Sequence, residues 1–395
     1  MQHDRNDVGP ILVADDDPLQ IEIITTVLRQ QGVSTVASAL GGQEALANLK
    51  QPGASYAAIF LDLQMPGMDG IGVMRELVRT KCPSPIILCS GEDNSILQAA
   101  ESFANQSGLR VAGVLSKPVT PEQVSICLSA LKQGAQGSNP LPQVSTEELQ
   151  RALQQQELLL HFQPKVKVGS LQPVGAEALV RWNHPKHGMI PPASFIPLAE
   201  ETGLIDLLTE QVLNMAVESL ARWQQADFSI TLSVNLSMDN LHDEALTDRL
   251  VRALQRRGLS PASIVLELTE SRLMQSNATP LGILTQVRLA GFGLSIDDFG
   301  TGFSSLEQLR KLPFTELKLD RAFVHDAHRD TRRHAILEAS LTMAKKIGLK
   351  TVAEGVENED DAALVTSLGC DLLQGYHIAR PLPASDFERW LTSRL

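Results

Sequence analysis

Short apolar runs alternate with amphipathic stretches along most of the chain, and this pattern constrains the fold more than any other feature. Within the first 132 residues the apolar runs cover residues 10–14, 57–61, 85–89 and 111–115. Helix-like stretches, such as residues 21–30 and 42–50, lie between the runs. This alternation predicts βαβ units and a doubly wound, flavodoxin-like α/β domain built on a parallel sheet.

Residues 133–145, QGAQGSNPLPQVS, lack periodicity and are rich in Gly, Pro, Gln and Ser, a composition typical of a linker. We therefore expect a first domain over residues 8–132 and a second over residues 146–395. The second region contains strand candidates at residues 158–163, 174–182, 230–235, 263–268, 293–297, 316–319, 350–354 and 370–374. About eight strands that alternate with helices over about 250 residues predict a TIM-like β/α barrel.

Charge and composition exclude several classes of protein. The chain has 34 Lys and Arg against 46 Asp and Glu, and this net charge of −12 disfavours DNA as a partner. Its four cysteines show neither metal-site spacing nor a disulfide framework. No apolar run approaches the roughly 18 residues of a membrane-spanning helix, and the first residues lack the features of a signal peptide. We expect a cytoplasmic protein without membrane insertion.

Acidic residues follow the strands predicted in the first domain. Asp15 and Asp16 come directly after the first apolar run, Asp62 ends the second, and Ser90 and Lys117 end the third and fourth. The carboxyl ends of parallel strands meet at one edge of a sheet, and clustered carboxylates there favour a bound Mg²⁺. A carboxylate beside Mg²⁺, a lysine and a hydroxyl can accept a phosphoryl group. The alternative is a solvated acidic loop with an ordinary lysine at a strand end.

Four motifs in residues 8–132 resemble the response-regulator receiver family: DD at 15–16, LDLQMPGMDG at 61–70, CSG at 89–91 and KP at 117–118. The resemblance implies that Asp62 is the phosphoacceptor, that Asp15 and Asp16 hold one Mg²⁺, and that Ser90 and Lys117 respond to the phosphoryl group. It also implies a histidine kinase or phosphotransfer protein as the donor. Val114 stands where the family often has an aromatic switch residue, which questions the usual coupling of hydroxyl shift to ring rotation.

In the second region, successive side chains of a strand point to opposite faces. One face of each predicted strand carries the aliphatic residues that pack against helices, and the other face carries polar groups. A polar group that points into a barrel must be paired or must bind a ligand, and active sites lie at the C-terminal ends of barrel strands. The candidates are Glu177, Asn235, Glu267, Asp297, Asp298, Lys318, Glu354 and Gln374. The alternative is a set of buried lysine–carboxylate pairs that only stabilises the barrel interior.

Four carboxylates with one amide oxygen suit Mg²⁺ or Mn²⁺. Gly300 and Gly302 follow Asp297 and Asp298, so the chain can turn and bring both aspartates to one site. A shared aspartate between two ions is expected in a two-metal hydrolase. Lys318 is a cation among acids, so we assign it to holding the attacking water or neutralising developing charge, and not to the general base.

Seven motifs over residues 145–395 resemble the EAL domain: EALVRW at 177–182, VNLS at 234–237, ELTE at 267–270, DDFGTGFSSL at 297–306, KLD at 318–320, EGVE at 354–357 and QGY at 374–376. The EAL family are cyclic-di-GMP phosphodiesterases with a β/α barrel fold. The resemblance implies hydrolysis of cyclic-di-GMP to linear 5′-pGpG with two Mg²⁺ or Mn²⁺ ions. No GG[DE]EF stretch is present, so cyclase activity is not expected.

The resemblance also implies a role for each residue. One metal is held by Glu177, Asn235, Glu267 and Asp297, and the other by Asp297 and Asp298. The catalytic set is Glu177, Lys318 and Glu354, with the last two beside the attacking water. Substrate contacts fall to Arg181, Gln163 and Gln374, although for Gln163 a strand-end hydrogen bond is an equal alternative.

Glu270 would anchor the loop 298–305, which couples the metal site to a dimer contact in the family, so a homo-oligomer is expected. Phe303 stands where the family often has Tyr, and we expect catalysis to persist without that hydroxyl. The leading hypothesis is a cyclic-di-GMP phosphodiesterase regulated by phosphorylation of Asp62. The alternative is a catalytically weak barrel that acts as a cyclic-di-GMP receptor or interaction module. A DNA-binding regulator is not expected, because no basic helix or third domain is visible.

Overall fold

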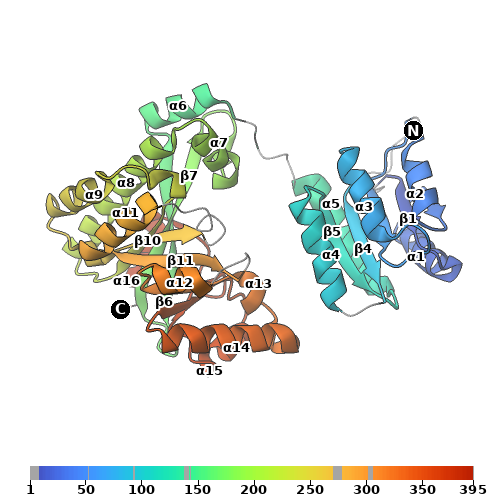
Figure 1. The fold of residues 1–395 in the computed structure, drawn as a ribbon. Coiled ribbons are helices and arrows are strands. Elements are labelled where there is room, and N and C mark those ends of the chain that lie inside the picture. Colours follow the sequence, from blue (N-terminus) through green and yellow to red (C-terminus); the bar gives the residue numbers. More distant parts are fainter. Residues whose placement is uncertain are drawn as a thin grey trace. The chain divides into compact units, whose positions relative to one another are not determined.

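The computed structural model describes residues 9–51, 53–91, 94–137, 142, 144–269, 278–300 and 306–394. The chain divides into two compact units, one within residues 1–140 and the other within residues 141–395 (Figure 1). In the described part of the chain, no helix combines the length and apolar character needed to cross a membrane.

The first unit is the predicted doubly wound α/β domain. Its parallel sheet has the strand order β2-β1-β3-β4-β5, and its strands are β1 (Ile11–Ala14), β2 (Val36–Ala39), β3 (Ala58–Asp62), β4 (Ile86–Ser90) and β5 (Val111–Ser116). The helices are α1 (Pro18–Gln30), α2 (Gly42–Leu49), α3 (Gly70–Arg79), α4 (Asn94–Gln106) and α5 (Pro121–Gly137). Alternate strand residues pack into two separate apolar clusters, so both faces of the sheet are covered.

Two local features differ from the sequence predictions. Strand β2 has the sequence VASA and is only partly buried, so it lacks the apolar run by which the other four strands are predicted. Helix α5 extends to Gly137, five residues into the segment expected to be a linker. The next helix, α6 (Thr146–Gln155), begins after Ser145, whose side chain forms a capping box with Glu148.

The second unit is a closed barrel of eight strands. They are β6 (Leu158–Lys167), β7 (Pro173–His184), β9 (Thr231–Asn235), β10 (Ile264–Thr269), β11 (Gly293–Phe299), β12 (Glu316–Leu319), β13 (Lys350–Ala353) and β14 (Leu372–Leu373). Strand β6 pairs antiparallel with both β7 and β14 and so closes the barrel, whereas neighbouring pairs from β7 through β9 to β14 are parallel. The predicted barrel is confirmed. Two short strands, β8 (Gly188–Ile190) and β15 (Leu382–Pro383), are too brief to show in the sequence pattern.

Helices surround the barrel (Figure 1). They are α7 (Ile196–Glu201), α8 (Ile205–Gln225), α9 (Leu246–Gln255), α11 (Ala278–Leu289), α12 (Leu306–Lys311), α13 (Arg321–Val324), α14 (Thr331–Lys346), α15 (Glu359–Ser367) and α16 (Ala384–Thr392). Short 3₁₀ turns are η1 (Pro192–Ser194), η2 (Met238–Asn240), η3 (Pro261–Ser263) and η4 (Ala327–Arg329). Aliphatic strand residues such as Val234, Leu266 and Leu317 belong to the large apolar cluster that these helices share. The other strand face therefore carries the polar side chains inward.

Candidate active site

Four carboxylates, three of them buried and one partly buried, meet around one lysine inside the barrel. The Nζ atom of Lys318, on β12, lies 2.7 Å from Glu354 Oε1, 2.8 Å from Glu267 Oε2, 2.9 Å from Asp297 Oδ1 and 3.3 Å from Glu177 Oε2. The lysine side chain is 1% exposed. These five residues come from five different strands or strand ends, so the inward faces predicted from alternation converge as expected.

Asp297 and Asp298 are adjacent, yet both contribute to this site. Asp298 adopts a left-handed backbone conformation with φ 54°, and the pairing of β11 with β12 is irregular between Ile296 and Phe299. A bulge of this kind re-aims a side chain that would otherwise point away. The sequence predicts a turn at Gly300 and Gly302, but the turn begins at Asp298 itself. Gly300 follows with φ 100°, and Gly302 lies outside the described residues.

Amide side chains hold the carboxylate of Glu177. Asn235 Nδ2 donates to Glu177 Oε1 at 2.9 Å, and Gln374 Nε2 donates to Glu177 Oε2 at 2.6 Å. Gln374 Nε2 also lies 3.2 Å from Gln163 Oε1, and Gln163 Nε2 donates to the carbonyl of Ala379 at 3.3 Å. Gln163 therefore lies inside β6 and not at a strand end as predicted, and its side chain contacts both the site and the Ala379 carbonyl.

Two hollows open beside these residues. One of about 220 Å³ is lined by Gln163, Glu177, Arg321, Glu354, Gly355, Glu357, Gln374, Gly375 and Tyr376. The other, of about 570 Å³, has a mostly apolar wall from β7, α7 and α8, with Asn235 and Asp298 at its edge. Arg181 is half-buried, four residues along β7 from Glu177 and on the same side of the strand. Glu270 and residues 301–305, including Phe303, lie outside the described residues.

Burial and crowding perturb the acids of the site. Burial, with the like charge of Glu267, raises the pKa of Asp297 to about 7 although Lys318 opposes the shift. Burial also raises the pKa of Glu354 well above its usual range. Burial alone would raise the pKa of Glu267, but Lys165 and Lys318 outweigh it and lower that pKa to about 2. Crowded carboxylates of this kind are stabilised by cations.

The donor set suits divalent cations. Oxygen atoms of Glu177, Glu267 and Asp297 lie within 4.8 Å of one another, and so do oxygen atoms of Asp297, Asp298 and Glu354. Asp297 is common to both groups, as a bridging ligand would be. Oxygen ligands from carboxylates are those that Mg²⁺ and Mn²⁺ prefer, so the residues present fit two such ions.

Sequence reasoning missed Lys165, which is buried below the site. Its Nζ atom lies 2.8 Å from Glu267 Oε1, 3.1 Å from Glu316 Oε1 and 2.7 Å from Ser233 Oγ. The available signal was alternation, because Lys165 stands two positions after Gln163 and therefore shares its inward face.

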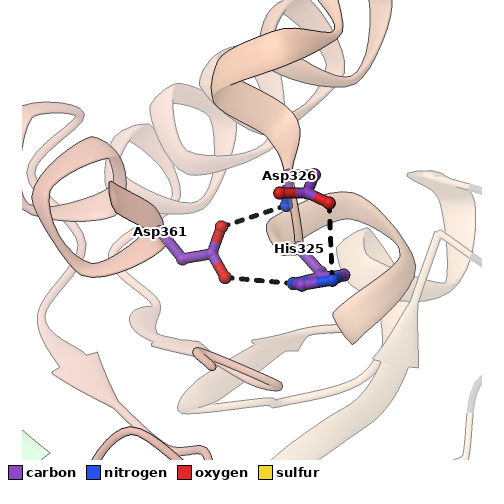
Figure 2. Close-up of side chains that lie close together, drawn as sticks. All are labelled: His325, Asp326 and Asp361. Atoms are coloured by element: carbon purple, nitrogen blue, oxygen red, sulfur yellow. Dashed lines mark hydrogen bonds and ion pairs between the residues drawn. The ribbon is translucent and has the colours of Figure 1, made fainter. Parts of the chain in front are cut away.

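A second cluster that the sequence did not reveal joins the first turn of α15 to the segment after β12 (Figure 2). Asp361 is fully buried, and its Oδ1 accepts from the backbone amide of Asp326 at 3.0 Å. Its Oδ2 contacts His325 Nδ1 at 3.2 Å, Asn358 Nδ2 at 3.0 Å and the Glu357 amide at 3.3 Å. Because both oxygens already have donors, we interpret Asp361 as a link between the loop after β13 and the segment after β12.

The first unit gathers its predicted residues at the carboxyl ends of β1, β3 and β5. Lys117 Nζ lies 2.7 Å from Asp15 Oδ2 and 2.8 Å from Asp62 Oδ2. Asp62 is buried, its Oδ1 has no hydrogen-bond partner among the described residues, and burial raises its pKa. Asp16 is exposed at the same edge, and its carboxylate completes a group with those of Asp15 and Asp62. The unpartnered Oδ1 of Asp62, beside the carboxylates of Asp15 and Asp16, fits a bound cation.

Two further predicted residues belong to this part of the sheet. Ser90 is buried at the end of β4. Val114 is partly buried on β5 and packs against the apolar cluster on one face of the sheet. Neither side chain is fully exposed to solvent.

Family comparisons agree with this architecture. The family model described as EAL domain matches residues 146–381, and the one described as response regulator receiver domain matches residues 11–128. The chain therefore belongs to the EAL domain family and carries a receiver domain in its first part.

Individual relatives share one or both domains. The chain is 34% identical over 388 residues to the cyclic di-GMP phosphodiesterase RocR of Pseudomonas aeruginosa, covering 97% of this chain and 98% of RocR. It is 44% identical over 240 residues to the bifunctional diguanylate cyclase/cyclic di-GMP phosphodiesterase MucR of the same organism, covering 60% of this chain and 35% of MucR. A solved structure of the PaMucR phosphodiesterase in complex with c-di-GMP is 42% identical, with a TM-score of 0.58, and covers 61% of this chain and 98% of that chain.

Proposed function

We propose that this protein is a phosphodiesterase that hydrolyses cyclic-di-GMP to linear 5′-pGpG under the control of its receiver domain. The observation that carries the proposal is the convergence of oxygen ligands and one lysine at the barrel mouth. The similarity to RocR over 97% of this chain supports the same substrate and the same pairing of receiver with barrel.

Two divalent ions would be held by this set of oxygens. Glu177, Asn235, Glu267 and Asp297 are the proposed ligands of one ion, and Asp297 and Asp298 of the other. Bound there, Mg²⁺ or Mn²⁺ would lower the pKa of a water molecule and neutralise charge on the phosphoryl oxygens. Asn235 would supply its amide oxygen, which is a different atom from the Nδ2 that donates to Glu177.

The chain's own residues orient the reaction. Lys318 donates hydrogen bonds from a buried ammonium, so it can hold the attacking water and stabilise negative charge that develops on the phosphate. Glu354 lies 2.7 Å from that ammonium and can take up the proton that the water loses. Glu177 is fixed by two amide donors and therefore presents its carboxylate in one orientation.

Substrate recognition is proposed for the residues around the hollows. Arg181 carries a fork of donors that matches a phosphate and lies on the inward side of β7. Gln163 and Gln374 line the smaller hollow and would contact the dinucleotide. The larger hollow has a mostly apolar wall against which a guanine base would pack.

Regulation is proposed at Asp62. Its buried carboxylate beside Lys117 resembles a phosphoacceptor, with Asp15 and Asp16 as ligands of one Mg²⁺ and Ser90 as the responding hydroxyl. A histidine kinase or phosphotransfer protein would donate the phosphoryl group. Phosphorylation would alter the contacts between copies of the chain in a homo-oligomer and thereby the loop after Asp298.

Product analysis tests the proposal. Purified protein is incubated with cyclic-di-GMP and Mg²⁺, with and without acetyl phosphate, and the nucleotides are identified by chromatography and mass. We expect 5′-pGpG from the unsubstituted protein and from a Glu338→Gln control on the exposed face of α14, but not from Glu177→Gln. Binding of cyclic-di-GMP without product in either phosphorylation state would instead support the receptor module.

A further inference from the structure

A second layer of polar side chains lies beneath the candidate metal site. Three of its members each stand two positions before a residue of the site on the same strand: Ser233 before Asn235, Ser295 before Asp297, and Glu316 before Lys318. Residues two apart share one face of a strand, so these side chains point inward one layer deeper. Strand β6 runs in the opposite direction, so Lys165, two positions after Gln163, falls in the same deeper layer.

Lys165 is held by acceptors from three strands. Its ammonium lies 2.7 Å from Ser233 Oγ on β9, 2.8 Å from Glu267 Oε1 on β10 and 3.1 Å from Glu316 Oε1 on β12. An ammonium has three protons, so each proton has an acceptor. A buried charge is costly unless it is paired and hydrogen-bonded in this way. The position of Lys165 is therefore fixed.

Glu267 is held from both sides. Lys165 contacts its Oε1 and Lys318 contacts its Oε2, each at 2.8 Å, and the glutamate side chain is fully buried. Lys318 is shared with three other carboxylates at the mouth, whereas the described contacts of Lys165 reach only one proposed metal ligand. The two lysines therefore have different tasks: one faces the reacting groups and the other supports a ligand from below.

We propose that Lys165 is a positioning residue for the divalent cation. By holding Oε1 of Glu267, it turns Oε2 toward the mouth, where Glu177 and Asp297 supply further oxygens. This inference rests on the proposed function, in which Glu267 is a metal ligand. Partners that orient a ligand are typically worth about 10- to 100-fold in metal affinity.

A pair of substitutions isolates this contact. Lys165→Met combined with Glu316→Gln removes one positive and one negative charge, so the net charge of the barrel interior is unchanged. Glu316→Gln alone is the matched control, because it leaves Lys165 in contact with Glu267. Mn²⁺ binding to the full-length variants is followed by electron paramagnetic resonance. Binding in the barrel is taken as the part lost on Asp297→Asn, so an ion in the receiver domain is not counted.

We expect the double variant to bind Mn²⁺ in the barrel about 10- to 100-fold more weakly than the control. Its hydrolysis of cyclic-di-GMP should fall at low Mg²⁺ and recover as Mg²⁺ is raised, a recovery that a general packing defect would not show. Equal Mn²⁺ affinity in the double variant and the control would overturn the inference. If the unsubstituted protein and Asp297→Asn bind Mn²⁺ equally, no ion binds in the barrel, and this result would instead overturn the proposed function.

A milder variant covers the case in which the double variant does not fold. Ser233→Ala removes one acceptor of Lys165 and leaves both charged partners in place. We expect a severalfold weaker Mn²⁺ affinity and only a small fall in melting temperature, because both ion pairs of Lys165 remain. An unchanged affinity in this variant would also overturn the inference.

Discussion

Lys318→Met tests the electrostatic balance of the barrel, because it removes the ammonium and keeps the length of the side chain. The ammonium now contacts four carboxylates at 2.7–3.3 Å. After the substitution Glu267 retains Lys165, but Asp297 and Glu354 lose the cation beside them. The variant should therefore be less stable than the unsubstituted protein when no divalent ion is bound to replace the lost charge.

The size of the effect follows from burial. Removing one partner of a buried ion pair costs about 3–5 kcal/mol. In a unit of roughly 250 residues each kcal/mol lowers the melting temperature by about 2–4 °C, so we expect a fall of about 6–20 °C in EDTA. Mg²⁺ at 100 times its dissociation constant adds about 2.7 kcal/mol and should restore much of this loss. Mg²⁺ should stabilise the variant more than the unsubstituted protein, since the ammonium no longer repels it.

Tryptophan fluorescence follows this unit alone, because Trp182, Trp223 and Trp390 are the three tryptophans of the chain and all lie in the barrel. Thermal unfolding is recorded in EDTA and in Mg²⁺. Lys350→Met is the control, because it makes the same lysine-to-methionine change at an exposed position. Hydrolysis by Lys318→Met should stay low even after Mg²⁺ restores its stability. An unchanged melting temperature in EDTA would refute the reasoning.

Three further predictions concern other parts of the molecule. Asp361→Ala removes the acceptor of several buried donors, so we expect faster hydrogen exchange at residues 354–358. Because Glu354 belongs to that segment, kcat should also fall. Hydrogen-exchange protection equal to that of the unsubstituted protein would contradict the assigned link. Arg181→Lys should raise the KM for cyclic-di-GMP by about tenfold with a smaller change in kcat, because a lysine lacks the fork of donors; an unchanged KM in steady-state assays would remove Arg181 from the substrate contacts. Asp62→Asn should abolish labelling by acetyl phosphate on phosphate-affinity gels and any effect of acetyl phosphate on turnover; labelling that persists would place the phosphoacceptor elsewhere.

The fold of the first unit was largely predictable because four of its five strands are apolar runs between amphipathic helices. Each of the four longest runs in the first unit became a strand, whereas β2, with two alanines and a serine, has too little apolar character to stand out. Gly134 and Gly137 suggested a linker, but helix α5 continues through both. Glycine is only about 1 kcal/mol less favourable than alanine in a helix, so composition alone does not end one.

The candidate site was predictable in part, for a related reason. Alternation along a strand shows which residues face inward, and so it brought together Glu177, Glu267 and Lys318. It does not show backbone irregularities, and the bulge at Asp298 could not be located from the sequence. Contacts between segments far apart in the sequence, such as those of Asp361 with the segment after β12, depend on the three-dimensional path of the chain and leave no periodic signal.

Anomalous diffraction from crystals grown with Mn²⁺ tests the central claim most directly. The account predicts two peaks in the barrel. One should lie within about 2.0–2.4 Å of oxygen atoms from Glu177, Asn235, Glu267 and Asp297, and the other should lie at a similar distance from Asp297 and Asp298. Mn²⁺ bound only in the receiver domain, or ions in the barrel that do not touch these oxygens, would contradict it.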